Sequence, residues 1–444
     1  MKTLIVNAKI VNEGKVTEGD VLIDGQHIAR IGKGLSHPGK TIDAAGHYLI
    51  PGAIDDQVHF REPGLTHKAT IYTESRAAVA GGVTSYMEMP NTVPPTFTQD
   101  LLEEKYQRAQ RDSLANYSFY MGTANDNLQE ILRTDLTRVC GLKIFMGSST
   151  GNLLVDDPKV LRSVFSNFPG LIASHCEHEP TIRKNAEQFK AQYGDKVTPS
   201  MHPQIRNVEG CYLSSHMAVE LAREFGTRLH VLHISTAKET ELFSNELPLS
   251  KKKITAEACI HHLWFNDSDY DRLGMYIKWN PAIKTSADQA AILKAVLDNR
   301  IDVIATDHAP HTREEKQQPY FSAPAGGPLV QHSVVAMMEF VKQGKLSIER
   351  MVEKMCHNPA LLFRIEDRGF IREGAYADLV IVDPHRPWRV EPSNIRAKCG
   401  WSPFEGQVFQ SQVTHTFVSG HLAYENGVLY EGQSGMRLSF RPDW

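Results

Sequence analysis

From Ile54 onward, short apolar runs alternate with longer segments whose apolar residues recur at helical spacing. Segments such as Asp100–Arg111, Tyr212–Phe225 and Ser286–Leu297 are predicted to be helices. Eight strands are predicted between the helices: Ile54–Arg61, Thr84–Met89, Tyr117–Met121, Gly141–Met146, Leu171–His175, Leu229–Ile234, Ile254–Ala258 and Val303–Asp307. Strand-and-helix units repeated over roughly 250 residues are typical of a TIM-type (β/α)8 barrel, so the pattern predicts an α/β fold of that class.

The two ends of the chain have a different pattern. Residues 1–53 contain short alternating segments, Leu4–Val11, Asp20–Ile23 and His27–Ile31, separated by glycine-containing turns. Short strands return after about residue 372, at Ala377–Val382 and Val413–Val418. We therefore expect a small β-sandwich domain built from both termini (residues 1–53 and 372–444) around a barrel at 54–371. The last residues, 432–444, carry no clear pattern.

Composition narrows the class of protein. The 444 residues are 41% hydrophobic and 23% charged, with a net charge of −4. That near balance gives no electrostatic case for binding nucleic acid or an anionic membrane. The N-terminal sequence does not resemble a signal peptide, no apolar run approaches the length of a membrane span, and the six cysteines are widely spaced. These features predict a cytoplasmic protein with reduced thiols.

The first predicted barrel strand carries polar residues at alternate positions. Asp55, Gln57, His59 and Arg61 are two residues apart in sequence, so they are expected to share one face of the strand. Four polar side chains on a barrel strand are costly unless they have partners. At the carboxyl end of such a strand they indicate an active site. The alternative is a hydrogen-bonded cluster without a catalytic role.

Four other strands carry a residue that can bind metal at or near their carboxyl ends. Lys143 lies in GLKIFM, His175 ends LIASH, His233 ends LHVLH and Asp307 ends VIATD. Taken singly, each has a simpler explanation: a lysine that extends to the barrel mouth, or a histidine satisfied in the core. Together with His59 they form a set of ligand-type residues at the ends of strands one, four, five, six and eight. An acid such as Asp307 can also act as a general base.

Seven motifs along the chain point to one family. They are VHFREPG at Val58–Gly64, MPNT at Met89–Thr92, KIFMGS at Lys143–Ser148, HIST at His233–Thr236, AEACIHHL at Ala256–Leu263, KWNP at Lys278–Pro281 and ATDHAPH at Ala305–His311. By these motifs the chain resembles the cyclic amidohydrolase branch of the amidohydrolase superfamily, and the dihydroorotases most closely. The resemblance extends from Pro51 to Gly406.

The resemblance implies a zinc-dependent enzyme of de novo pyrimidine (UMP) synthesis that interconverts L-dihydroorotate and N-carbamoyl-L-aspartate. It implies one or two Zn²⁺ ions per chain, a bridging N6-carboxylysine at Lys143, and Asp307 as metal ligand and catalytic base. It also implies a small-molecule substrate and association of barrels into homo-oligomers. The implied metal ligands are His59, Lys143, His175, His233 and Asp307, and the implied substrate-binding residues are Arg61, Asn91, Asn280, His311, Ala325 and Gly326. Arg61 is expected to bind the substrate carboxylate.

The chain departs from the family pattern D-x-H-x-H-x-R at one ligand position, where Gln57 replaces the first histidine. A neutral amide binds zinc-like ions poorly. Three outcomes stay open: a weak ligand at a two-metal site, a single metal held by Lys143, His175 and His233, or a non-catalytic subunit. Allantoinase or hydantoinase activity is the alternative within the enzyme class. A second departure is at Lys278–Lys284, where Lys284 takes the place of a common arginine.

Overall fold

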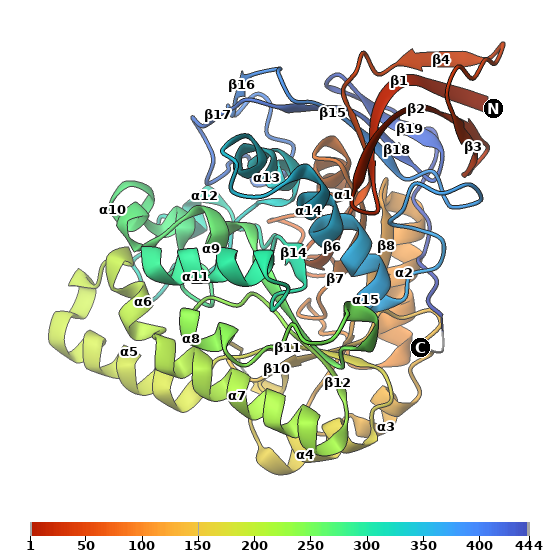
Figure 1. Cartoon of the computed structure of the whole chain (residues 1–444). Helices are drawn as coiled ribbons and strands as arrows, with labels where there is room; N and C mark the ends of the chain where they lie inside the picture. The colour runs from red at the N-terminus through yellow and green to blue at the C-terminus, as the bar shows by residue number, and fades with distance from the viewer. Residues whose placement is uncertain (1, 150, 442–444) are drawn as a thin grey trace.

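Eight parallel strands form a barrel at the centre of the computed structural model, which describes residues 2–149 and 151–441 (Figure 1). Each sequence-predicted strand is confirmed, with ends shifted by a few residues. The barrel strands are β6 Ala53–Val58, β7 Val83–Glu88, β8 Asn116–Phe119 with its continuation β9 Met121–Gly122, β10 Leu142–Phe145, β11 Leu171–His175, β12 Arg228–Val231, β13 Ile254–Cys259 and β14 Val303–Ala305.

Hydrogen bonds carry the pairing around the whole ring. β8 and β9 are separated by Tyr120 alone, whose N–H donates to the carbonyl of Glu88 on β7. The order then runs from β9 through β10, β11, β12 and β13 to β14. A parallel bridge between Val58 and His308 joins the last strand to the first. The carboxyl ends of all eight strands therefore meet at one rim, which is where a site on this fold is built.

Helices connect the strands and cover the outside of the barrel (Figure 1). The three sequence-predicted helices are confirmed as α2, α7 and α11. Thr285 caps α11 through a capping box with Asp288, which explains why that helix begins at Ser286. The helices are α1 Ile71–Ala80, α2 Gln99–Asp112, α3 Leu128–Leu132, α4 Pro158–Asn167, α5 Glu179–Tyr193, α6 His202–Ile205, α7 Val208–Phe225, α8 Ala237–Thr240, α9 Ile260–Trp264, α10 Tyr270–Leu273, α11 Ser286–Leu297, α12 Arg313–Lys316, α13 Ser333–Lys342, α14 Ile348–Val352 and α15 Asn358–Phe363. None of the helices in the described part of the chain has the length and hydropathy of a membrane span.

Strands from both ends of the chain share one sheet beside the barrel. β5 Tyr48–Pro51 pairs with β1 Lys2–Asn12 on one side and with β15 Leu379–Asp383 on the other, so the strands from the two chain ends adjoin with no barrel strand between them. The sheet order is β20-β19-β18-β15-β5-β1-β2-β3, with β4 paired to β1. Its strands are β1 Lys2–Asn12, β2 Lys15–Asp24, β3 His27–Gly32, β4 Lys40–Asp43, β5 Tyr48–Pro51, β15 Leu379–Asp383, β18 Gln412–Val418, β19 His421–Glu425 and β20 Val428–Leu429, and a separate pair joins β16 Trp388–Arg389 to β17 Val408–Phe409. The expected fold class, a (β/α)8 barrel with a small β domain from both termini, is confirmed.

The first barrel strand contains an irregularity that the sequence did not predict. The register of β6 against β7 shifts between Asp55 and Val58, which breaks strict alternation of side chains. Asp55 accepts hydrogen bonds from the hydroxyl and N–H of Thr306, the residue after β14. Asp56 instead lies 3.1 Å from His230 on β12, across the barrel. The expectation that Asp55 shares a face with Gln57, His59 and Arg61 is therefore wrong for Asp55.

The patternless C-terminal segment is attached to the barrel by backbone hydrogen bonds. Tyr117 donates to the carbonyl of Met436, and Leu438 and Phe440 donate to the carbonyls of Tyr117 and Thr137. Both Leu438 and Phe440 are buried. Tyr117 lies at the amino end of β8, so the segment packs at the amino end of the barrel. The candidate site described below lies at the opposite, carboxyl end.

Candidate active site

A cavity of about 260 Å³ lies at the carboxyl rim of the barrel. It is lined by Gln57, His59, Arg61, Asn91, Lys143, Phe145, Ser148, His175, His233, Trp279, Asn280, Asp307, Ala309, His311 and Ala325. Every sequence-predicted site residue is in this set except Gly326. The N–H of Gly326 donates to the carbonyl of Lys278, and its own carbonyl accepts from Lys316, so its backbone is engaged within the protein. Pocket size suits a small molecule.

His59 and Asp307 form one half of the site. The Nδ1 of His59 lies 2.7 Å from Asn91 Oδ1, and its Nε2 lies 3.1 Å from Asp307 Oδ1. Because an amide oxygen only accepts, Nδ1 carries the hydrogen, and the Nε2 lone pair of the neutral ring faces a carboxylate. Burial lowers the pKa of His59 well below its ordinary value, so the ring is neutral. A lone pair facing a carboxylate is repulsive unless a proton or cation lies between them, so this pair fits a metal ion.

Gln57 contacts the same oxygen of Asp307 as His59 does. Its Nε2 donates to Asp307 Oδ1 at 3.2 Å, while its Oε1 lies 3.7 Å from Cys259 Sγ. The amide oxygen, the atom able to bind a metal, thus faces Cys259. This arrangement favours an amide that orients Asp307 over an amide that binds a metal. Burial raises the pKa of Asp307 to about 7, although Lys143 and His175 act to lower it.

His175 and His233 form the other half of the site. His175 Nε2 lies 2.9 Å from Glu177 Oε2, and its Nδ1 lies 2.9 Å from His233 Nε2. Glu177 is fully buried and also pairs with Arg206. A histidine that donates one ring N–H to a carboxylate and presents the other nitrogen to a cavity has the arrangement of a metal ligand. The two facing nitrogens therefore fit a second cation.

Lys143 lies on β10 and is only 1% exposed. Its Nζ lies 4.6 Å from the centroid of the Phe145 ring, and no hydrogen-bonding partner for it is found in residues 2–149 or 151–441. Burial lowers the pKa of Lys143 to about 8. An amine that is partly neutral near physiological pH reacts with carbon dioxide more readily than an ordinary lysine, whose pKa is about 10.4.

Arg61 also lines the cavity and is 6% exposed. Its Nε donates to the carbonyl of Pro310, and its Nη2 donates to His311 Nε2 at 3.0 Å. The same His311 nitrogen lies 2.9 Å from the Ala325 carbonyl, and His311 Nδ1 lies 3.0 Å from Lys68 Nζ. Arg61 makes no ion pair with a carboxylate among the described residues, and burial lowers its pKa to about 10. A buried guanidinium without an anion is costly, so this place fits an anionic ligand group.

Four non-glycine residues that line the cavity have left-handed backbone. They are Arg61 at φ 69°, Ser148 at φ 55°, His233 at φ 39° and Asp307 at φ 47°. Such conformations cost about 1–3 kcal/mol each. For Asp307, the indole N–H of Trp279 bonds the residue's own carbonyl at 3.2 Å, which helps to hold it in place. Strain concentrated at a cavity indicates that the fold maintains a defined arrangement there.

The sequence analysis missed several contributors. Phe145, Ser148, Trp279 and Ala309 line the cavity without having been singled out, and Glu177 holds His175 from behind. All except Ser148 lie within two residues of a predicted site residue, so proximity in sequence was an available signal for them. Cys176, next to His175, is buried and does not line the cavity. All six cysteines are free.

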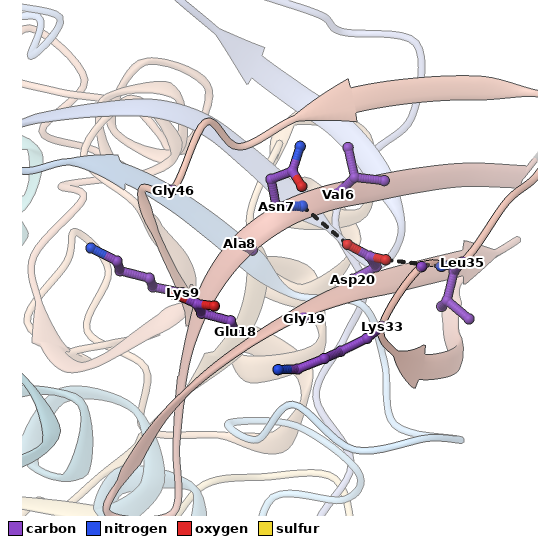
Figure 2. Close-up of a pocket in the computed structure, with 11 residues that line it drawn as sticks. Val6, Asn7, Ala8, Lys9, Glu18, Gly19, Asp20, Lys33, Leu35 and Gly46 are labelled. Atoms are coloured by element: carbon purple, nitrogen blue, oxygen red, sulfur yellow. Dashed lines mark hydrogen bonds between the residues drawn. The ribbon is translucent and has the colours of Figure 1, made fainter.

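A larger cavity, of about 560 Å³, lies in the sheet formed by the chain ends (Figure 2). Asp20 there accepts hydrogen bonds from the backbone N–H groups of Asn7 and Leu35. Its carboxylate therefore joins β1 to the turn after β3. The cavity has no histidine and no cluster of buried acids, so we assign the chemistry to the smaller cavity at the barrel rim.

Comparisons with known proteins agree with this geometry. A model of the amidohydrolase family matches residues 168–423, and a dihydro-orotase-like model matches residues 46–143. The dihydroorotase of Halobacterium salinarum is 32% identical over 91% of this chain and 92% of that protein. The dihydroorotase of Methanosarcina mazei is 33% identical over 90% of each. The solved structure of L-hydantoinase (dihydropyrimidinase) from Arthrobacter aurescens has a TM-score of 0.93 and 28% identity, covering 99% of both chains.

Proposed function

The chain belongs to the amidohydrolase family, and from this premise we propose that it interconverts L-dihydroorotate and N-carbamoyl-L-aspartate in pyrimidine synthesis. The substrate assignment rests on Arg61, a buried guanidinium in the cavity without a carboxylate partner among the described residues. The substrate carboxylate would supply that partner. Relatives called dihydroorotase, at 32% and 33% identity over most of the chain, support the same assignment.

We further propose that residues 54–371 form a zinc-dependent catalytic unit. His59 and Asp307 would hold one ion and His175 and His233 another, with Lys143, carboxylated at Nζ, joining the two. Carboxylation would convert a buried ammonium into an anionic ligand. When bound, the ions would lower the pKa of a water molecule and polarise the ring carbonyl. The repulsive contact between His59 and Asp307 supports the first position, and the Glu177-held His175 supports the second.

The remaining steps belong to the protein's own side chains. Asp307 lies in the cavity and accepts a hydrogen bond from Gln57, which holds its carboxylate in one orientation. It would accept a proton from the attacking water and return it to the departing ring nitrogen. Asn280 donates to Ser148 through Nδ2, and its Oδ1 has no hydrogen bond among the described residues. That oxygen and the Ala325 carbonyl would accept ring N–H groups, while Arg61, Asn91 and His311 would surround the carboxylate.

A second candidate function is hydrolysis of a hydantoin-type ring, supported by the similarity to the L-hydantoinase structure. We rank it below dihydroorotate because a hydantoin ring without a carboxylate would leave Arg61 without an anionic partner. We also infer a cytoplasmic enzyme that binds only small molecules and assembles from copies of itself. The free cysteines support the compartment.

The test of this function is a paired assay of turnover and metal content. Purified protein should open the dihydroorotate ring faster than a hydantoin with an apolar substituent, and it should contain zinc. A strong chelator should abolish turnover, and added Zn²⁺ with bicarbonate should restore it. Faster hydrolysis of the hydantoin would favour the second candidate. Protein without metal and without turnover would indicate a non-catalytic relative and contradict the proposal.

Replacement of Gln57 tests what its amide does. In Gln57→His, a nitrogen ligand replaces the amide, so the number of zinc ions per chain should rise if the first position is incompletely filled. In Gln57→Met, which has similar length but no polar group, zinc content should stay unchanged while kcat falls by roughly fivefold, because Asp307 loses an orienting hydrogen bond worth about 1 kcal/mol. Zinc content is measured by elemental analysis. Loss of zinc in Gln57→Met would show that the amide is a ligand after all.

A further inference from the structure

A second group of possible ligands lies deeper in the barrel than the cavity. Asp56 on β6, His230 on β12 and Glu257 on β13 bring one ligand atom each to within 4.8 Å of the others. All three side chains are completely buried. None of them lines the cavity, and none belongs to the metal ligands proposed above. Glu257 lies between the two places, because its Oε1 accepts the backbone N–H of His233.

The atoms of this cluster face one another without hydrogen bonds. Both oxygens of Asp56, Oε2 of Glu257 and Nε2 of His230 are buried and make no hydrogen bond among the described residues. His230 Nε2 lies 3.1 Å from Asp56 Oδ2 and 3.9 Å from Glu257 Oε2. These distances are in the range between neighbouring ligands of one ion, since metal–ligand bonds are about 2.0–2.2 Å long. Buried polar atoms without partners require an explanation.

The other nitrogen of His230 fixes its tautomer. Thr255 donates its hydroxyl hydrogen to the carbonyl of Leu229, so its oxygen accepts from His230 Nδ1 at 2.9 Å. Nδ1 therefore carries a hydrogen, and Nε2, which faces the two carboxylates, is the nitrogen available to a cation. Donation of one ring N–H to a neighbour while the other nitrogen faces ligands is the usual arrangement of a metal-binding histidine.

Charge points to the same conclusion. Two ionised carboxylates leave a buried charge of −2 beside a neutral imidazole and of −1 beside an imidazolium, and burying unpaired charge is strongly unfavourable. A divalent cation would make the cluster neutral. A nitrogen and several carboxylate oxygens suit zinc, manganese or ferrous iron better than magnesium or calcium, which prefer oxygen alone. We propose that Asp56, His230 and Glu257 bind a divalent transition-metal ion, separate from the metals of the catalytic cavity.

A proton is the competing occupant. Burial opposes a charge on His230, but the Asp56 and Glu257 carboxylates outweigh it and raise the pKa of His230 to about 9. An imidazolium would balance one of the two negative charges, whereas a divalent cation balances both. Metal would also fix Glu257, whose other oxygen holds the backbone of His233 and accepts from the Cys259 thiol. The ion would thus stabilise the floor of the catalytic site without touching substrate.

The deciding experiment is a crystal structure of the native full-length chain, purified and crystallised in mildly alkaline buffer with added zinc. Anomalous scattering at the zinc edge should show a peak between the three side chains, in addition to any peak in the cavity. Absence of a peak there, with peaks present at His59 or His175, would overturn the proposal in favour of the proton. This measurement needs no variant and does not depend on the substrate.

Variants give an independent measurement in solution. The double variant Asp56→Asn, Glu257→Gln keeps the shape of both side chains but removes both negative charges. It should contain one fewer metal ion per chain than the native protein. Glu239→Gln is the matched control, because Glu239 is also buried but bonds Ser215 and Thr236, and it should keep the native metal content. Equal metal content in all three folded proteins, verified by circular dichroism, would contradict the proposal.

Discussion

Replacement of Asp307 by asparagine is expected to lower kcat for dihydroorotate hydrolysis by about 10³–10⁴-fold, the upper range for loss of a general acid–base group. Asparagine has the same shape and can still accept the hydrogen bond from Gln57 Nε2. It cannot take a proton from water or return one to the ring nitrogen. It also removes the carboxylate that faces His59 at 3.1 Å. The loss should therefore fall on kcat, with a smaller change in KM.

Metal analysis separates the two roles of Asp307. If the variant keeps its zinc and loses turnover, the lost function of Asp307 is proton transfer. If it also loses zinc, the carboxylate acts as a metal ligand as well. Asp55→Asn is the matched control, because Asp55 is equally buried but bonds Thr306 outside the cavity. It should change kcat by less than about tenfold, the equivalent of 1.36 kcal/mol. Near-native turnover in Asp307→Asn would remove Asp307 from the mechanism.

Arg61→Asn should reduce kcat/KM for dihydroorotate by about 10²–10³-fold, since truncation of one partner of a buried charge pair costs about 2–5 kcal/mol. The reason is that the substrate carboxylate would enter a buried place without its guanidinium. A hydantoin with an apolar substituent should lose much less, because it brings no anion to that place. The measurement is the ratio of kcat/KM for the two substrates in native and variant protein.

Arg61→Lys serves as the intermediate case. It keeps a positive charge but loses the planar fork and the Nε–H that bonds the Pro310 carbonyl. Its kcat/KM should fall between those of the native protein and Arg61→Asn. If all three proteins treat dihydroorotate equally, the carboxylate binds elsewhere and the substrate assignment fails.

The barrel could be predicted from sequence because its strands are buried on both faces and read as apolar runs of strand length. Leu171–His175 and Val303–Asp307 are examples, each ending in the polar residue that reaches the rim. Parallel strands place their carboxyl ends at the same rim, so metal-binding residues at those ends could be predicted to share one cavity. His59, His175, His233 and Asp307 all line it. This part of the site follows from topology alone.

Contacts that depend on local irregularity could not be predicted. The register shift in β6 directs Asp56 across the barrel to His230, against the alternation expected of a regular strand. The role of Gln57 also depends on which end of its amide meets Asp307, which the residue type does not reveal. The segment at 432–444 has no periodicity because its described part is held by backbone hydrogen bonds, which any sequence can make.

The sheet shared by the two chain ends links folding to the completion of synthesis. β5 leaves the ribosome early, yet the neighbour on its second edge, β15, emerges only after the entire barrel has been made. Until then β5 presents an unpaired strand edge to solvent, and such edges recruit other chains. Pairings between distant segments also form slowly. The nascent chain is therefore most vulnerable to aggregation in the interval between release of the barrel and arrival of its last strands, and this is where a chaperone would have the greatest effect on yield.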